Sequence, residues 1–236
     1  MKKIGIIFAM EEEISAFKEH IHIDKEENIF ELHFYEGFSN NNQCIFTVSG
    51  VGKVNSARTC QILIDHYKVD IVINVGVAGG INNSLKIGDI IIGEKLVQHD
   101  FDITAFNHKL GYIPNVGIYI NSDPYLVNLS KKILKNSNYI FYTGTIASGD
   151  IFCTDKEQSI KIANEFESLC VEMEGASIAQ VCYLCRTPFL VLRCISDVPN
   201  NNNVITYEEF LNISSKKIAL VLKKILESVG LKGLAM

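Results

Sequence analysis

The sequence predicts an α/β protein that folds around a mostly parallel sheet. Short apolar runs rich in β-branched residues alternate with amphipathic stretches along the whole chain, which is the pattern of strands that lead into helices. The chain has 236 residues, 47% of them hydrophobic, so it can bury a large core without disulfides or metals. No linker rich in Pro, Gly or Ser and no internal repeat divides it. We therefore expect a single domain over residues 1–236.

The first third of the chain is expected to hold two helices among four strands. Residues 3–8 form an apolar strand, and the helix that follows opens with three glutamates, which favour a helix N-terminus. Residues 31–38 and 44–49 flank an asparagine-rich turn, as the strands of a hairpin do. Apolar residues have helical spacing in 53–67, and residues 70–75 form a buried strand.

Strands and helices continue to alternate in the rest of the chain. We expect strands at 89–92, 139–147, 169–171 and 189–195, and helices at 124–135, 173–185 and 207–228. Residues 98–118 carry several aromatic side chains but no clear periodicity. An apolar loop of this kind is either a lid over a substrate or a patch that a second subunit covers.

The composition excludes several classes of function. There are 22 Lys and Arg residues against 27 Asp and Glu, whereas a protein that binds nucleic acid needs clustered basic residues. No signal peptide or transmembrane segment is recognisable, so we expect a cytoplasmic protein that does not bind membranes. The seven cysteines have no regular spacing, which favours reduced thiols. Cys182 and Cys185 lack a second pair of ligands, so we expect no metal site.

Ligands of open α/β sheets bind beyond the carboxyl ends of the strands, where loops and helix N-termini meet. The glycines at these ends do not match the known phosphate-binding motifs. A P-loop ending at Lys53 would need Ser or Thr in place of Val54, and a dinucleotide fingerprint starting at Gly50 would need glycine in place of Asn55. The cluster at residues 76–80 either makes a tight turn or lets backbone amides approach a ligand.

Carboxylates follow most of the predicted strands and are the first candidates for chemistry. One of the glutamates at 11–13 could act as a general base toward water, but the pattern does not choose among them. Glu172 and Glu174 lie at a strand-to-helix junction. They could stabilise the helix N-terminus, or they could accept hydrogen bonds from the two hydroxyls of a ribose.

Arg193 is the most informative basic residue. It interrupts an apolar run that has the composition of a central strand, and a buried guanidinium needs carboxylate or ligand partners. Its partner could be Glu172 or Glu174 in a structural ion pair, or it could be a ligand. Alternate residues of a strand share one face, so we expect Asp197 in the same region as Arg193. Its position at the exit of the strand makes Asp197 a candidate general acid.

Six segments together resemble the 5'-methylthioadenosine/S-adenosylhomocysteine nucleosidase family, which belongs to the larger purine nucleoside phosphorylase group. They are GIIFAMEEE at 5–13, SGVGK at 49–53, NVGVAGG at 74–80, SGD at 148–150, VEME at 171–174 and RCISD at 193–197. The resemblance implies a three-layer α/β/α domain with a central mixed, twisted sheet, as in nucleoside phosphorylases. It also implies hydrolysis of the N-glycosidic bond of 5'-methylthioadenosine and S-adenosylhomocysteine, with 5'-deoxyadenosine as a further candidate substrate. No cofactor is implied.

The resemblance assigns roles to individual residues. Glu13 matches the base that activates water, and Asp197 matches the acid that protonates N7 of adenine. Glu174 matches the acceptor of the ribose hydroxyls, Met173 packs on the sugar and Phe152 stacks on the purine. The further residues that we expect around the substrate are Met10, Val51, Val77, Gly79, Cys153, Arg193, Ser196 and Tyr207.

Phe106 and Pro114 match the segment that closes the 5'-substituent pocket of the neighbouring subunit in this family. The resemblance therefore implies a homodimer. The chain departs from the frequent family residues at four positions, which are Val77 for serine, Cys153 for isoleucine, Pro199 for alanine and Tyr207 for phenylalanine. Val77 removes a side-chain hydrogen bond near the ribose, and Tyr207 could alter how the 5'-substituent is held.

Water is a better nucleophile than phosphate for this chain. A phosphorylase needs cationic groups around its phosphate, but the only arginines are Arg58, Arg186 and Arg193, and the loop after the first strand is triply acidic. Two alternatives remain open. An aminofutalosine nucleosidase has the same chemistry and differs in the 5'-substituent. A non-catalytic sensor of purine nucleosides would have no reason to retain both Glu13 and Asp197.

Overall fold

The computed structural model describes residues 1–198 and 207–230, and of residues 207–209 the backbone alone. In chain order its elements are β1 (Lys3–Phe8), α1 (Glu11–Lys18), β2 (Ile23–Ile29), β3 (Leu32–Ser39), β4 (Asn42–Val48), α2 (Lys53–Asp65), β5 (Ile71–Gly80), β6 (Ile90–Gln98), a 3₁₀ turn (Thr104–Phe106), β7 (Ile120–Asn121), α3 (Pro124–Lys135), β8 (Phe141–Ser148), α4 (Lys156–Phe166), β9 (Ser168–Glu172), α5 (Gly175–Leu184), β10 (Phe189–Asp197) and α6 (Tyr207–Ser228). The alternation of strands and helices that the sequence predicts is confirmed.

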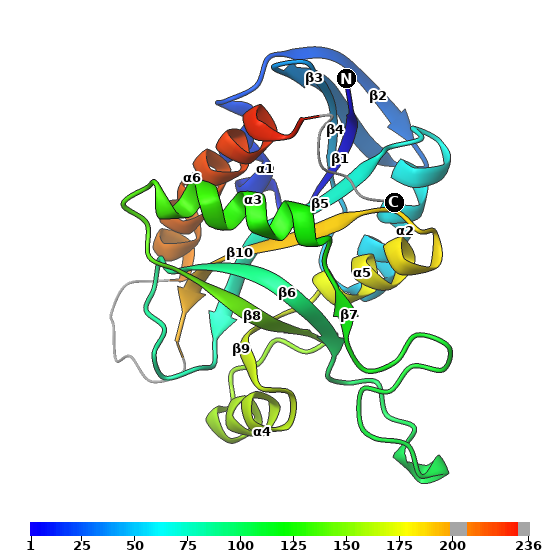
Figure 1. The fold of residues 1–236 in the computed structure, drawn as a ribbon, viewed down its shortest axis with the longest axis vertical. Coiled ribbons are helices and arrows are strands. Elements are labelled where there is room, and N and C mark those ends of the chain that lie inside the picture. Colours follow the sequence, from blue (N-terminus) through cyan, green and yellow to red (C-terminus); the bar gives the residue numbers. More distant parts are fainter. Residues whose placement is uncertain (199–206, 231–236) are drawn as a thin grey trace.

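The strands form one mixed sheet (Figure 1). β1 lies between β4 and β5 and is parallel to both. β3 and β2 extend the sheet beyond β4 as antiparallel strands, which leaves β2 as the outer strand of this arm. On the other side, β5 is parallel to β10 over most of its length. Buried apolar residues fill β1, β5 and β10, as expected for parallel strands that are covered on both faces.

The other half of the sheet closes on itself. The last residues of β5, Gly79 and Gly80, pair with Val171 and Cys170 of β9 in an antiparallel ladder. β9 is parallel to β8, β8 is parallel to β6, and β6 is antiparallel to β10, which pairs again with β5. β5 is parallel to β10, β8 is parallel to β9, and the end of β5 pairs with β9. The final residues of these four strands therefore converge on one region.

Helices cover both faces of the sheet and complete three layers. α1, α3 and α6 pack on one face against a core that includes Phe8, Phe17 and Phe46 (Figure 1). α2 and α5 pack against each other on the opposite face, over a second core that includes Leu63 and Ile178. α4 lies against β8 and β9. The mixed α/β class and the layered arrangement are as predicted.

Four elements are absent from the expectations, and two strands are longer than expected by several residues. The additional elements are β2, the 3₁₀ turn, β7 and α4. β5 continues from the apolar run through the glycines to Gly80, and β6 continues to Gln98. These extensions carry the chain into the closed circuit of strands. Within residues 1–198 and 207–230, no helix is both long and apolar enough to cross a membrane.

Candidate active site

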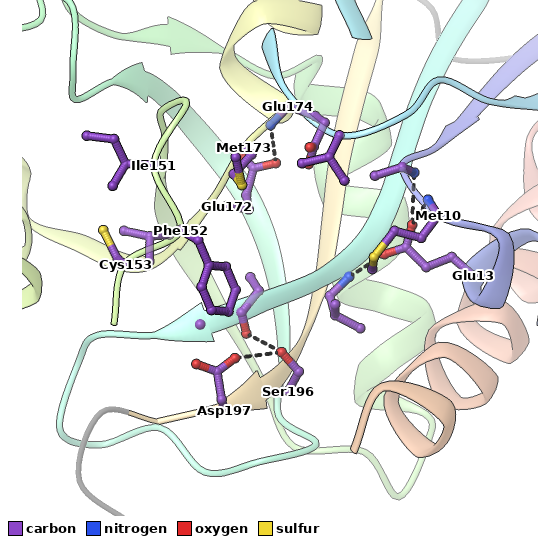
Figure 2. A pocket seen from close by; sticks show the side chains of 16 residues that line it. Met10, Glu13, Ile151, Phe152, Cys153, Glu172, Met173, Glu174, Ser196 and Asp197 are labelled. Atoms are coloured by element: carbon purple, nitrogen blue, oxygen red, sulfur yellow. Dashed lines mark hydrogen bonds between the residues drawn. The ribbon is translucent and has the colours of Figure 1, made fainter. Parts of the chain in front are cut away.

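One cavity lies where β1, β5, β8, β9 and β10 end (Figure 2). The residues that line it are Ala9, Met10, Glu13, Val51, Val77, Ala78, Gly79, Ile151, Phe152, Cys153, Val171, Glu172, Met173, Glu174, Ser196 and Asp197. The residues that the sequence predicts for catalysis or substrate binding line this cavity, with the exception of Arg193; the side chain of Tyr207 falls outside the described part of the chain. Five strand ends, together with Val51 from the loop after β4, thus supply a single site, which is the expected position for a ligand of an α/β sheet.

Glu13 is the only one of the three successive glutamates in α1 that points into the protein. Its side chain is buried, whereas Glu11 and Glu12 are exposed. Its carboxylate accepts hydrogen bonds from the backbone amides of Ala9 at 2.9 Å, Met10 at 3.2 Å and Val77 at 2.9 Å. Burial raises the pKa of Glu13, although Arg193 and these amides oppose the increase.

A glycine in β5 makes room for the Glu13 carboxylate. A Cβ atom added to Gly76 would lie 2.5 Å from Oε1 of Glu13, which is far inside van der Waals contact. Any other residue at this position would therefore push the carboxylate away from the amide of Val77. The sequence leaves open whether the glycines at residues 76–80 make a tight turn or let a ligand approach the backbone. They continue strand β5, and at Gly76 the group that approaches the backbone is a carboxylate of the same chain.

Arg193 lies behind the cavity wall with 1% of its surface exposed. Its guanidinium donates to the carboxylate of Glu172 and to the side-chain oxygen of Asn74, and it lies 3.9 Å from the carboxylate of Glu174. The ion pair that the sequence offers as one alternative is therefore present. Arg193 does not line the cavity, so its place in the site is to balance the charge of the carboxylates in front of it.

Glu172 and Glu174 both line the cavity at the N-terminus of α5. Glu172 accepts hydrogen bonds from the backbone amides of Glu174 at 3.1 Å and Gly175 at 2.7 Å, and from the hydroxyl of Ser148. Glu174 accepts one from the amide of Gly52 at 2.9 Å. Burial and then the charge of Glu172 raise the pKa of Glu174 to about 7, against the opposing effect of Arg193.

Ser196 and Asp197 form a different wall of the cavity, at the end of β10 (Figure 2). The hydroxyl of Ser196 donates to Oδ1 of Asp197 at 2.8 Å. Partial burial raises the pKa of Asp197, and the Ser196 hydrogen bond opposes this. Strict alternation along the strand predicts only Asp197 on this side. The pairing of β10 with β5 shifts register between Ile195 and Asp197, and both side chains reach the cavity.

The loop after β8 supplies an apolar wall. Ile151, Phe152 and Cys153 line the cavity, and Figure 2 shows the Phe152 ring directed toward the strand end that carries Asp197. Phe152 has 61% of its surface exposed, so a flat ligand can reach the ring. Burial raises the pKa of the Cys153 thiol, which therefore stays protonated. Met10 and Glu13 lie across the cavity from this loop.

Two predicted residues lie on the surface away from the cavity, and the side chains of two others fall outside the described part of the chain. Phe106 and Pro114 belong to the segment 98–118 and are exposed on the surface, where Phe106 has 75% of its area accessible. Pro199 and the side chain of Tyr207 fall outside the described residues. The sequence does not single out Ala9, Ala78, Ile151 and Val171, which carry no group that would mark them, and it leaves the part played by Glu172 open.

The described wall of the cavity is acidic. It holds the carboxylates of Glu13, Glu172, Glu174 and Asp197, and none of its described residues is Lys, Arg or His. The nearest cation in the hydrogen-bond network is Arg193, which is already paired. Within residues 1–198 and 207–230, no cluster of His, Cys, Asp and Glu has an arrangement that could hold a metal ion. The arrangement suits an uncharged or cationic ligand with hydroxyl groups.

The fold and this cavity define a protein of the phosphorylase superfamily, whose sequence model matches residues 3–227. A 5'-methylthioadenosine/S-adenosylhomocysteine nucleosidase of Staphylococcus carnosus is 38% identical over 227 residues, which cover 96% of this chain and all of the relative. The chain belongs to the 5'-methylthioadenosine/S-adenosylhomocysteine nucleosidase family. This is the family that the sequence motifs resemble, so the prediction is confirmed.

Solved structures show the same similarity. A mutant of the Helicobacter pylori nucleosidase with 5'-methylthioadenosine in the active site superposes with a TM-score of 0.93 at 38% identity, covering 97% of this chain and 100% of that one. The native futalosine hydrolase of Helicobacter pylori has a TM-score of 0.92 at 37% identity, covering 97% of this chain and 98% of the other.

Proposed function

We propose that the protein hydrolyses the N-glycosidic bond of 5'-methylthioadenosine and S-adenosylhomocysteine, releasing adenine and the 5'-substituted ribose. 5'-Deoxyadenosine is a further candidate substrate. The observation that carries the proposal is the acidic cavity, in which the described residues place four carboxylates and no cationic side chain. Such a cavity repels phosphate and stabilises positive charge on a sugar, so it favours water as the nucleophile. We assign the reaction to methionine salvage in the cytoplasm.

Asp197 is the residue that we propose to protonate the leaving base. Cleavage of the bond between C1' and the purine nitrogen places negative charge on adenine, which a proton donated to N7 neutralises. The raised pKa of Asp197 favours the protonated carboxyl that this step requires. Phe152 lies on the same side of the cavity and can stack on the purine while the proton is transferred.

Glu13 is the residue that we propose to activate water. Water forms the new bond to C1', and its proton passes to the Glu13 carboxylate, which three backbone amides hold in a fixed position. The raised pKa of Glu13 makes it a stronger base than an exposed glutamate. Arg193 lowers the same pKa and so helps to keep Glu13 ionised before the reaction begins.

Glu174 is the residue that we propose to bind the ribose hydroxyls. One of its oxygens accepts a hydrogen bond from Gly52, and a carboxylate has further lone pairs for the sugar. Positive charge builds on the ribose as the base departs, and the neighbouring carboxylate of Glu172 adds to its stabilisation. Met173 lies between these two glutamates on the cavity wall and provides the apolar surface under the sugar.

Product analysis tests the proposal directly. Purified protein is incubated with 5'-methylthioadenosine with and without phosphate, and the products are separated by chromatography. We expect adenine and 5-methylthioribose at the same rate in both. A requirement for phosphate, with a ribose 1-phosphate product, would show that the protein is a phosphorylase. Binding of the nucleoside without release of adenine would show that it is a sensor.

A second candidate substrate follows from the similarity to the futalosine hydrolase of Helicobacter pylori, which is as close as the similarity to the nucleosidase of that organism. Aminofutalosine carries a different group on the 5' carbon and needs the same acid, base and ribose acceptor. A panel of 5'-methylthioadenosine, S-adenosylhomocysteine and aminofutalosine, compared by kcat/KM, distinguishes the two substrates.

We propose in addition that the protein is a homodimer in which residues 98–118 of one subunit cover the pocket of the other. Phe106 and Pro114 are exposed on this segment and do not line the cavity of their own chain, which supports the proposal. Light scattering gives the mass, and Phe106→Asp is the variant that tests the contact. We expect a dimer that dissociates in the variant; a wild-type monomer with full activity would contradict the proposal.

A further inference from the structure

Two glycine-containing motifs at the strand ends include residues that the cavity wall does not use. Lys53 ends the SGVGK motif at the N-terminus of α2, and Asp150 ends the SGD motif after β8. Neither residue lines the cavity. In the sequence they are 97 positions apart, yet the backbone amide of Lys53 donates to Oδ1 of Asp150 at 2.8 Å.

A third residue, Asp100, completes a cluster of hydrogen bonds. Its Oδ1 accepts from Nζ of Lys53 at 2.6 Å, and its Oδ2 accepts from the backbone amide of Asp150 at 2.9 Å. The Lys53 ammonium also donates to the side chain of Gln98 at 3.2 Å. Both the Lys53 and the Asp100 side chains have only 17% of their surface exposed, so solvent screens this ion pair less than a surface pair.

The backbone at Gly52 is shaped to admit Asp150. Gly52 has a φ of +104°, a conformation that side-chain-bearing residues rarely adopt, and a Cβ atom there would lie 3.2 Å from Oδ1 of Asp150. Glycine at this position therefore allows the close approach of the two segments. The same residue donates its amide to Glu174, as described above.

The cluster joins two walls of the cavity that are distant in sequence. The backbone amide of Gly52 donates a hydrogen bond to the carboxylate of Glu174, and the backbone amide of the next residue, Lys53, donates one to the carboxylate of Asp150. Asp150 is followed directly by the residues of the apolar wall, including Phe152. The other end of this loop is held at Asp155, whose side chain accepts from the amide of Glu157 at the start of α4. A movement of Asp150 would therefore move the Phe152 ring relative to Glu174.

We propose that Lys53, Asp100 and Asp150 are positioning residues that set the separation between the purine-stacking wall and the ribose-binding carboxylate. This inference rests on the proposed function for the nature of the substrate. The three residues do not touch the substrate and act through the loop at 151–154 and through Gly52. Substrate binding, rather than the chemical step, is the property that depends on them, because the acid and the base are held by other contacts.

The test compares two substitutions at one position. Asp150→Ala removes the acceptor for the Lys53 amide, whereas Asp150→Asn keeps an oxygen in the same place. We expect Asp150→Ala to raise KM for 5'-methylthioadenosine by about tenfold while kcat changes by less than about threefold. We expect Asp150→Asn to restore KM to within about twofold of the wild-type value. Lys53→Met should resemble Asp150→Ala, and Lys131→Met, which removes an exposed ion pair with Glu94 at 3.1 Å, should have no effect.

Two further measurements do not depend on turnover. Calorimetric titration with adenine should show weaker binding to Asp150→Ala, again by about tenfold, because the stacking wall is displaced. Hydrogen exchange should show faster exchange of the Lys53 amide and of the loop after Asp150 in this variant. If the wild-type protein binds adenine but cleaves no nucleoside, these measurements still test the positioning role while the proposed function fails.

Three results would overturn the inference. The first is an unchanged KM and adenine affinity in Asp150→Ala. The second is equal loss in Asp150→Asn and Asp150→Ala, which would show that the negative charge rather than the hydrogen bond matters. The third is a fall in kcat and in melting temperature with KM unchanged, which would show a role in stability alone.

Discussion

Gly76→Ala adds one methyl group at the point where the Glu13 carboxylate approaches β5. The new Cβ atom would lie 2.5 Å from Oε1 and 3.1 Å from Cδ of Glu13. To reach the 3.4 Å of an ordinary contact the carboxylate must retreat by roughly 0.9 Å. The hydrogen bond from the Val77 amide, now 2.9 Å long, would then exceed 3.5 Å and be lost. Displacement of a catalytic base by about this distance lowers the rate of the reaction by about 100-fold.

The assay is the initial rate of adenine release from saturating 5'-methylthioadenosine. A second glycine gives the matched control, because a Cβ atom added to Gly144 in β8 would lie 2.8 Å from the side chain of Leu169, away from the cavity. Gly144→Ala should lower the free energy of unfolding by about 1–3 kcal/mol through overpacking. Its kcat should stay within about twofold of the wild-type value, because no group of the site moves.

The two variants together separate loss of stability from loss of the base. We expect Gly76→Ala to lose about 100-fold in kcat while it remains folded in circular dichroism and thermal melts. A kcat within about threefold of wild type would refute the assignment of Glu13 as the base at this position. An equal loss of kcat in Gly144→Ala would refute the argument from geometry, since it would show that crowding anywhere in the sheet has the same effect.

Three further predictions concern the charged residues of the site. Asp197→Asn should lower kcat by about 10³-fold with substrate binding retained, because an amide cannot transfer a proton to adenine; near-normal adenine release would exclude Asp197 as the acid. The Glu174 carboxyl has a pKa of about 7 in the folded state against a reference value of 4.5. Between these two pH values the folded protein holds a proton that the unfolded chain has released, so the free energy of unfolding should fall by roughly 3 kcal/mol as the pH rises from 4.5 to 7. Urea denaturation should therefore show Glu174→Gln to be more stable than wild type at pH 8 but not at pH 4, and an equal difference at both would contradict the shift. Arg193→Met leaves the buried Glu172 unpaired and should lower the free energy of unfolding by about 3–5 kcal/mol, whereas the exposed Arg58→Met should lower it by less than about 0.5; equal effects would show that the buried pair is not special.

Most elements of the fold could be predicted because burial leaves a clear pattern in the sequence. β1, β5 and β10 are covered on both faces, so they are continuous apolar runs. β2 could not be predicted in this way, since its sequence IDKEENI is mostly polar and it is stabilised by pairing with β3. α4 buries only Ser159, Ile162 and Phe166, which is a weak periodic signal, although Asp155 is a recognisable N-cap.

The site was predictable in position but not in detail. Carboxylates at strand ends mark the cavity, because parallel strands direct their carboxyl ends toward one edge. Spacing alone does not distinguish Glu13 from its two neighbours, since the distinction depends on Gly76 and on the amides around it. Pairing of Arg193 with Glu172 and the register shift before Asp197 depend on contacts between distant strands. The catalytic roles of these residues stay predictions until they are measured.

The outer strand β2 has a consequence for how copies of the chain can meet. An exposed strand edge is a template for pairing with another chain, and it leads to aggregation when the edge is apolar. β2 presents Asp24, Lys25, Glu26 and Glu27 along this edge, and most of these side chains are exposed. This stretch has three acidic residues against one lysine, so a second β2 placed alongside would meet net repulsion. The charges therefore keep the sheets of different molecules from joining and leave the helical and loop surfaces for ordered association.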